Sequence, residues 1–182
     1  MVTCDLPWAA LYSFMPILLS EIGAEIKSSF LLYLTLLIQS SFCIPGTVLS
    51  SFLATTSFGR KWTTVLGFFM TSASVLFFLV SSNYPMVLVS TCLINFFDFL
   101  GFSTLMALVT ESYPTNLRSL GLGWATAMLK LGAVISPAAI GYVFDQDGGI
   151  VVGVIILSFF FMSVAIFSCF LQEVNIIYSD FT

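Results

Sequence analysis

Asp98 and Lys130 are ionisable residues in the middle of long apolar segments. Asp98 lies 13 residues before Glu111, and Lys130 lies 12 residues after Arg118, where those segments meet a short polar stretch. At a helical rise of about 1.5 Å per residue, each would lie roughly 18–20 Å from the same end of its helix. Charges that deep in a membrane are costly and are by default candidates for a solute site or a proton relay. We predict that the two side chains approach one another, because pairing lowers the cost of burying both.

Other polar side chains accompany this pair. Thr91, Asn95 and Asp98 are spaced so that they share one face of a helix. Gln39 lies near the middle of a different apolar segment. Polar groups that converge from separate helices can form a solute site or a proton path at the membrane midplane. The alternative for Asn95 and Gln39 is hydrogen bonding that only holds the helices together.

The amino-acid composition indicates whether these residues lie in a water-soluble protein or in a membrane protein. Apolar residues make up 59% of the 182 residues, charged residues only 8%, and the mean hydropathy is +1.08. A soluble domain is about 45–50% apolar and about 25% charged, so the sequence predicts an integral membrane protein. The apolar runs are long and unbroken, which favours helices over the alternating strands of a membrane β-barrel.

The residue types also exclude several functions. The chain has no histidine, and its four cysteines are far apart in apolar runs, so we expect no metal site and interpret the cysteines as small buried side chains. A net charge of −4 with five basic residues gives no electrostatic basis for binding nucleic acid. No cofactor is expected.

Six apolar segments divide the chain, and no linker between them is long enough to separate two domains. We therefore predict an all-α membrane protein with one domain, residues 1–182, and six transmembrane helices. Pro45 and Gly46 in the second segment and Pro137 in the fifth predict bends. The six segments are about 2–22, 29–54, 62–80, 86–110, 120–144 and 150–171.

The basic residues predict how the helices are oriented. Arg60, Lys61 and Arg118 fall in two loops that six spans would place on one side, while the opposite loops contain only Lys27. Short cytoplasmic loops collect Lys and Arg. We therefore expect both termini in the cytoplasm, in a multi-pass protein of the plasma membrane or an endomembrane.

Two stretches go beyond these general features. The segment ALVTESYPTNLRSLGLGWATAMLKLGAVISP and the short loop sequence GRK resemble the major facilitator superfamily, in its sugar-porter and synaptic-vesicle-glycoprotein-like branch. The family pattern is roughly E-x-x-P-T-x-x-R-x-x-G, followed by a basic residue and a proline in the next helix. The matching residues are Glu111, Pro114, Thr115, Arg118, Gly121, Lys130 and Pro137, with Gly59, Arg60 and Lys61 in the second stretch.

The resemblance implies that the six helices form the C-terminal half of such a bundle, built as a 3+3 inverted repeat. It also implies a cytoplasmic charge network of Arg60, Lys61, Glu111 and Arg118 that stabilises one conformation, and we expect Glu111 to contact Arg118. The family's loop usually carries an acidic residue where this chain has Thr55, Thr56 and Ser57. The network is then weaker, or its acid comes from Glu111.

The leading hypothesis is a facilitator-type transporter of a small polar or organic solute, or its C-terminal half, working by alternating access. Asp98 could bind a proton, a cation or the solute, and the expected partners are the lipid bilayer and an N-terminal six-helix half. The alternative is a truncated remnant or scaffold that associates with another membrane protein. An intramembrane enzyme with paired aspartates is disfavoured, because Asp98 is the one aspartate at that depth. A fragment, a truncated product and a half that must associate all remain open.

Overall fold

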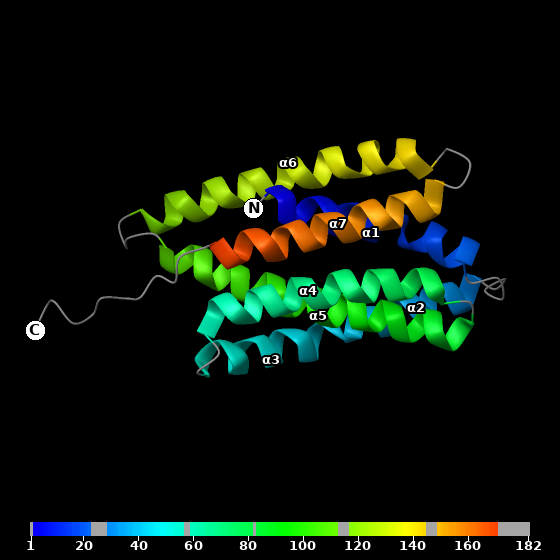
Figure 1. Ribbon diagram of the computed structural model, residues 1–182, viewed down its shortest axis with the longest axis horizontal. Coiled ribbons are helices and arrows are strands. Elements are labelled where there is room, and N and C mark those ends of the chain that lie inside the picture. Colours follow the sequence, from blue (N-terminus) through cyan, green and yellow to red (C-terminus); the bar gives the residue numbers. More distant parts are fainter. Residues whose placement is uncertain are drawn as a thin grey trace, which may run out of the picture.

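A computed structural model describes residues 2–22, 29–56, 59–81, 83–112, 117–144 and 149–170. Within these ranges the chain is almost wholly helical, and Figure 1 shows the helices running side by side along one direction. The helices are α1 (Val2–Ile22), α2 (Ser29–Ser41), α3 (Cys43–Thr55), α4 (Gly59–Val80), α5 (Tyr84–Ser112), α6 (Arg118–Phe144) and α7 (Gly149–Phe170).

Most of these helices can cross a membrane. Among the described residues, five stretches are long and apolar enough: 30–55, 59–80, 84–110, 118–144 and 149–169. Helix α1, with 21 residues, corresponds to the remaining predicted segment. A helix needs about 20 residues to cross the hydrocarbon core. The prediction of an all-α membrane protein built as a half-bundle of transmembrane helices is therefore confirmed.

The second predicted segment is divided into two helices. We expected one helix over 29–54 with a bend at Pro45 and Gly46, but α2 ends at Ser41 and α3 begins at Cys43. Pro45 has no N–H, so the Ser41 carbonyl loses its donor four residues ahead. The Phe42 N–H bonds to the Gln39 carbonyl at 3.2 Å, a tighter three-residue turn. The interruption therefore lies one turn before the proline, at the carbonyl that lacks a donor.

Helices α4 and α5 pack most extensively, because glycines let their backbones meet. A Cβ at Gly67 would lie 2.6 Å from the backbone of Gly101. A Cβ at Gly46 in α3 would lie 2.5 Å from the Phe96 carbonyl oxygen of α5. Small residues allow such approaches between helices in lipid. Helix α5 is therefore held between α3 and α4, with its polar face fixed in place.

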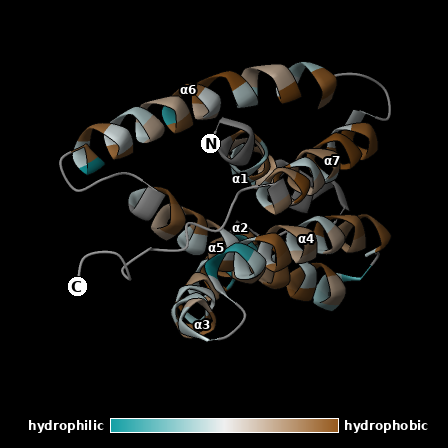
Figure 2. Cartoon of the chain, turned by 60° about the vertical axis from the view of Figure 1, so that its left-hand side comes forward, coloured by the Kyte–Doolittle hydropathy of each residue, from teal (hydrophilic) through white to brown (hydrophobic). Residues whose placement is uncertain are grey.

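Helices α1, α6 and α7 make the other side of the bundle. Helix α1 packs against α6 and α7, and α7 also packs along α4, which joins the two sides. The buried core includes Phe68 of α4 and Leu157 and Phe161 of α7. Hydrophobic residues also cover outward surfaces of α6 and α7 (Figure 2), where Val134 and Phe159 are each 75% exposed. This is the exterior that a lipid solvent favours.

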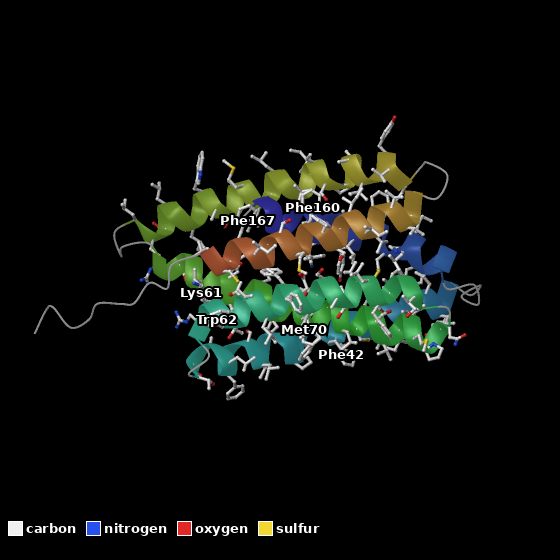
Figure 3. The ribbon with its side chains drawn as sticks, viewed as in Figure 1. Phe42, Lys61, Trp62, Met70, Phe160 and Phe167 are labelled. Atoms are coloured by element: carbon white, nitrogen blue, oxygen red, sulfur yellow. The ribbon has the colours of Figure 1, made fainter. Side chains whose placement is uncertain are left out.

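The basic residues gather at one end of the bundle. Helices α4 and α6 both begin at the end where α3, α5 and α7 finish (Figure 1). Lys61 and Trp62 lie at that end (Figure 3). Arg60, Lys61 and Arg118 are thus on one side of the bundle, as the predicted topology requires. Which membrane face this is stays a prediction.

Candidate functional site

Asp98 and Lys130 line one cavity. Its volume is about 210 Å³, and its other lining residues are Trp8 of α1 and Phe99 and Phe102 of α5. Asp98 is 5% exposed and lies at the middle of α5, while Lys130 is exposed and near the middle of α6. The two residues that the sequence placed at equal depth therefore share a cavity. A direct contact between the carboxylate and the ammonium stays a prediction.

A larger hollow lies elsewhere. It has a volume of about 620 Å³ and follows the first turns of α6, between Leu117 and Ala127. None of the described residues that line it is ionisable. A solute site needs a few polar groups that fix a ligand's orientation. The cavity at Asp98 is therefore the better candidate, although its volume is smaller.

The polar stripe of α5 is buried and connected to a second helix. The Asn95 amide nitrogen donates to the Thr91 carbonyl at 3.1 Å, and the Thr91 hydroxyl donates to the Leu88 carbonyl at 2.9 Å. Across the interface, the Cys43 thiol donates to Asn95 Oδ1 at 3.7 Å. Sequence reasoning treated Cys43 as a small apolar residue. A cysteine four residues after Gln39 was the available signal, since the sequence predicts a single helix over both residues.

Gln39 is 1% exposed in α2, and its Oε1 has no hydrogen-bond partner. It lies one helical turn from Cys43 at one end and one turn from Thr35 at the other. The Thr35 hydroxyl lies 3.1 Å from the Tyr84 hydroxyl of α5. Gln39 therefore belongs to the face of α2 that packs against α5.

An aromatic pair connects the cavity to α2. The ring of Trp8 stacks on Tyr12 with centroids 5.2 Å apart, and the Tyr12 hydroxyl lies 3.2 Å from Ser40 Oγ. Neither aromatic residue was predicted from the sequence to belong to a site. Their spacing of four along α1 was a signal that they share a face.

The predicted charge network is described in part. Arg60 and Lys61 are half-buried at the start of α4, and Arg118 is exposed at the start of α6. The side chain of Glu111 lies outside the described residues, so its expected contact with Arg118 stays a prediction. In the part of the chain that the structure describes, no three His, Cys, Asp or Glu side chains are grouped to hold a metal ion.

The sequence matches the family model of the Major Facilitator Superfamily over residues 3–176. The chain belongs to the Major Facilitator Superfamily. This confirms the superfamily part of the resemblance. It also makes the chain a multi-pass membrane protein of a family of solute transporters.

Two curated proteins are similar to the chain. The Niacin transporter NiaP of Acinetobacter baylyi is 28% identical over 140 residues, which cover 76% of this chain and 31% of the relative. The Inner membrane metabolite transport protein YgcS of Escherichia coli is 33% identical over 153 residues, covering 79% of this chain and 31% of the relative. The chain thus spans about a third of the length of these relatives.

Proposed function

We propose that the chain is the C-terminal six-helix unit, residues 1–182, of a facilitator-type transporter that carries a small polar or organic solute by alternating access. The observation that supports this most strongly is the cavity at mid-length of α5 and α6, where Asp98, Lys130 and Trp8 converge. Buried charge is costly in lipid, and a structural role rarely requires it. The named relatives transport niacin and a metabolite, which supports a small organic solute.

The finer branch is part of this proposal. The residues Glu111, Pro114, Arg118 and Gly121 follow the pattern of the sugar-porter and synaptic-vesicle-glycoprotein-like branch. The printed names of the relatives neither require nor exclude a sugar. Nicotinate and glucose are therefore the two probes with which to begin.

The chemistry of the cavity suggests two roles. The Lys130 ammonium can bind an anionic or acceptor group of the solute, and the aromatic ring of Trp8 can stack on a planar one. Asp98 can bind a proton, a cation or a donor group of the solute. If Asp98 gains and loses a proton, transport is coupled to a proton gradient.

The other half of the cavity would come from an N-terminal six-helix half. Relatives are about three times as long as their matched region, which supports this. At the basic end, Arg60, Lys61, Arg118 and Glu111 would form ion pairs in one conformation and separate in the other. Pairs of this kind bias a two-state equilibrium. We propose that this end and both termini face the cytoplasm, and that the membrane is a plasma membrane or an endomembrane.

Uptake into liposomes tests the proposal. The chain is reconstituted alone and joined to any six-helix segment encoded upstream of it, and uptake of radiolabelled nicotinate and glucose is measured with and without an inward proton gradient. We expect uptake only by the longer form. No uptake by either form, with both correctly folded, would favour the alternative of a non-transporting remnant or scaffold.

A second measurement tests the orientation. Single cysteines at Arg60 and Arg118 should react with an impermeant thiol reagent from the cytoplasmic side, and a cysteine at Asp145 from the opposite side. Labelling of all three positions from one side would contradict the proposed topology.

A further inference from the structure

Gln39 lies between two polar contacts, one that joins α2 to α5 and one that joins α3 to α5. Thr35 and Gln39 are one turn apart on the same face of α2, and Cys43 begins α3 four residues after Gln39. The first contacts Tyr84 at 3.1 Å and the third donates to Asn95 at 3.7 Å. Gln39, the middle member, has an acceptor oxygen that is buried and has no partner.

Two described donors of α5 near the level of Gln39 already have acceptors in their own helix. The contacts from Thr35 to Tyr84 and from Cys43 to Asn95 advance in the same direction on both helices, so Gln39 lies opposite the turn of α5 that contains Thr91. The Thr91 hydroxyl donates to Leu88, and the Asn95 amide donates to Thr91. The Thr91 hydroxyl and one N–H of the Asn95 amide therefore already have acceptors within α5.

An acceptor in this position is expensive for the fold. A buried carbonyl oxygen without a donor destabilises the fold, whereas a leucine of similar size would carry no such penalty. Buried polar groups of native proteins nearly always have partners, so an exception calls for a reason. The simplest reason is a partner from outside the chain that arrives with a donor group.

Two routes connect Gln39 with the cavity at Asp98. Along α5, Asp98 and Asn95 are neighbours on one face, and Asn95 contacts Cys43 one turn from Gln39. Along α1, Trp8 lines the cavity and stacks on Tyr12, whose hydroxyl lies 3.2 Å from Ser40. Polar and aromatic groups thus lead from the cavity to both sides of Gln39.

We propose that the interface between α2 and α5 is a binding site for a hydrogen-bond donor, a hydroxyl or N–H group, with Gln39 Oε1 as its acceptor. The donor belongs to the transported solute, which makes Gln39 a specificity-determining residue that favours solutes carrying such a group. A site built to accept a hydrogen bond discriminates strongly against analogues that lack the donor. Assigning the donor to the solute rests on the transport function proposed above, but the site itself can be tested without transport.

Cys43 offers a native reporter one turn away. With the other cysteines replaced by serine, the thiol is treated with three thiosulfonates: aminoethyl, which carries N–H donors and a positive charge; trimethylammonioethyl, which carries the charge without donors; and methyl, which has neither. Each reaction forms a disulfide with Cys43 and releases methanesulfinate. Rates are compared between the chain with Gln39 and the variant Gln39→Leu, which removes the acceptor at similar volume.

We expect Gln39→Leu to slow the aminoethyl reagent about two- to tenfold, the range of one net hydrogen bond, and to leave the other two rates within about twofold. Equal slowing of all three reagents, or no slowing of the aminoethyl reagent, would overturn the site. So would a Cys43 that none of the reagents reaches, because donors of that size then cannot enter.

Thermal stability in detergent supplies the second readout. Removing an acceptor without a partner should leave the melting temperature of Gln39→Leu unchanged or higher. The matched control is Asn95→Leu, whose amide makes contacts to Thr91 and Cys43 and whose loss should lower it. If Gln39→Leu lowered the melting temperature as much as Asn95→Leu does, Gln39 would have a purely structural role and the proposal would be overturned.

Solute and water are then distinguished by protection. Rapid labelling of Cys43 that the transported solute prevents, in the chain with Gln39 but not in Gln39→Leu, supports the solute as donor. Labelling that the solute never affects would assign the site to water and overturn the specificity role. Failure of uptake with an intact donor effect at Cys43 would instead count against transport, and not against the site.

Discussion

The α4–α7 interface and the α1–α5–α6 cavity both contain buried polar residues, but those residues differ in kind. Between α4 and α7, Ser72 and Ser158 lie with their hydroxyl oxygens 3.0 Å apart, and Ser72 also donates to the Ser158 carbonyl. The threonines of α4 donate to carbonyls of their own helix, as Thr71 does to Gly67 at 2.9 Å. The cavity is instead lined by the buried carboxylate of Asp98 and by the exposed side chain of Lys130. We therefore expect the functional role at the cavity that contains the buried Asp98, and not at the serine pair.

The packed side of the molecule should be the most sensitive to added volume. We expect Gly67→Ala to lower the free energy of unfolding by about 1–3 kcal/mol, because its Cβ would meet the backbone of Gly101 at 2.6 Å. The matched control is Gly123→Ala, where no atom lies within 4 Å of the added Cβ. It should be neutral or stabilise by up to about 1 kcal/mol through helix propensity. Denaturant unfolding in detergent measures both, and equal effects would contradict the close approach of α4 and α5.

The stability of the cavity side should depend on the charges of Asp98 and Lys130. If Asp98 and Lys130 interact, Asp98→Asn alone should destabilise the protein more than Asp98→Asn combined with Lys130→Met, because the single change leaves an ammonium without its partner. A coupling of about 1 kcal/mol is expected in the cycle from unfolding free energies. Strictly additive effects would mean that the two groups face the same cavity without interacting.

The smallest effect should come from the serine pair. Hydrogen bonds between transmembrane helices average about 0.6 kcal/mol in double-mutant cycles, so Ser72→Ala and Ser158→Ala should each cost less than about 1 kcal/mol. The same unfolding measurement checks this. A cost well above that of the Asp98 substitution would remove the distinction between the two regions.

The long apolar segments allowed the all-α membrane fold to be predicted from the sequence. Each run needs about 20 residues to cross a bilayer, and the lipid demands a helix because backbone groups must bond internally. The interruption at Phe42 was displaced from the expected Pro45, since the effect of a proline falls on the carbonyl four residues before it. The local sequence therefore predicted that this helix is interrupted, but not the residue at which the interruption lies.

Depth along a helix was also readable, because rise per residue is constant. Counting from Glu111 and Arg118 placed Asp98 and Lys130 at one level, and they line one cavity. The contacts between helices could not be predicted from the sequence in this way. The approach of Cys43 to Asn95 and the stacking of Trp8 on Tyr12 depend on how α1, α3 and α5 rotate against one another. No pattern within one segment fixes that rotation.

The most direct test of the account is the initial rate of solute uptake by Asp98→Asn compared with Ser72→Ala, in proteoliposomes of the form that transports. Both substitutions alter a buried polar residue, so protein yield and melting temperature are matched first. We predict that Asp98→Asn reduces the rate at least about tenfold, a loss of 1.4 kcal/mol or more in transition-state terms, while Ser72→Ala stays within about twofold. An Asp98→Asn protein that transports at the wild-type rate would contradict the assignment of the cavity to the solute path.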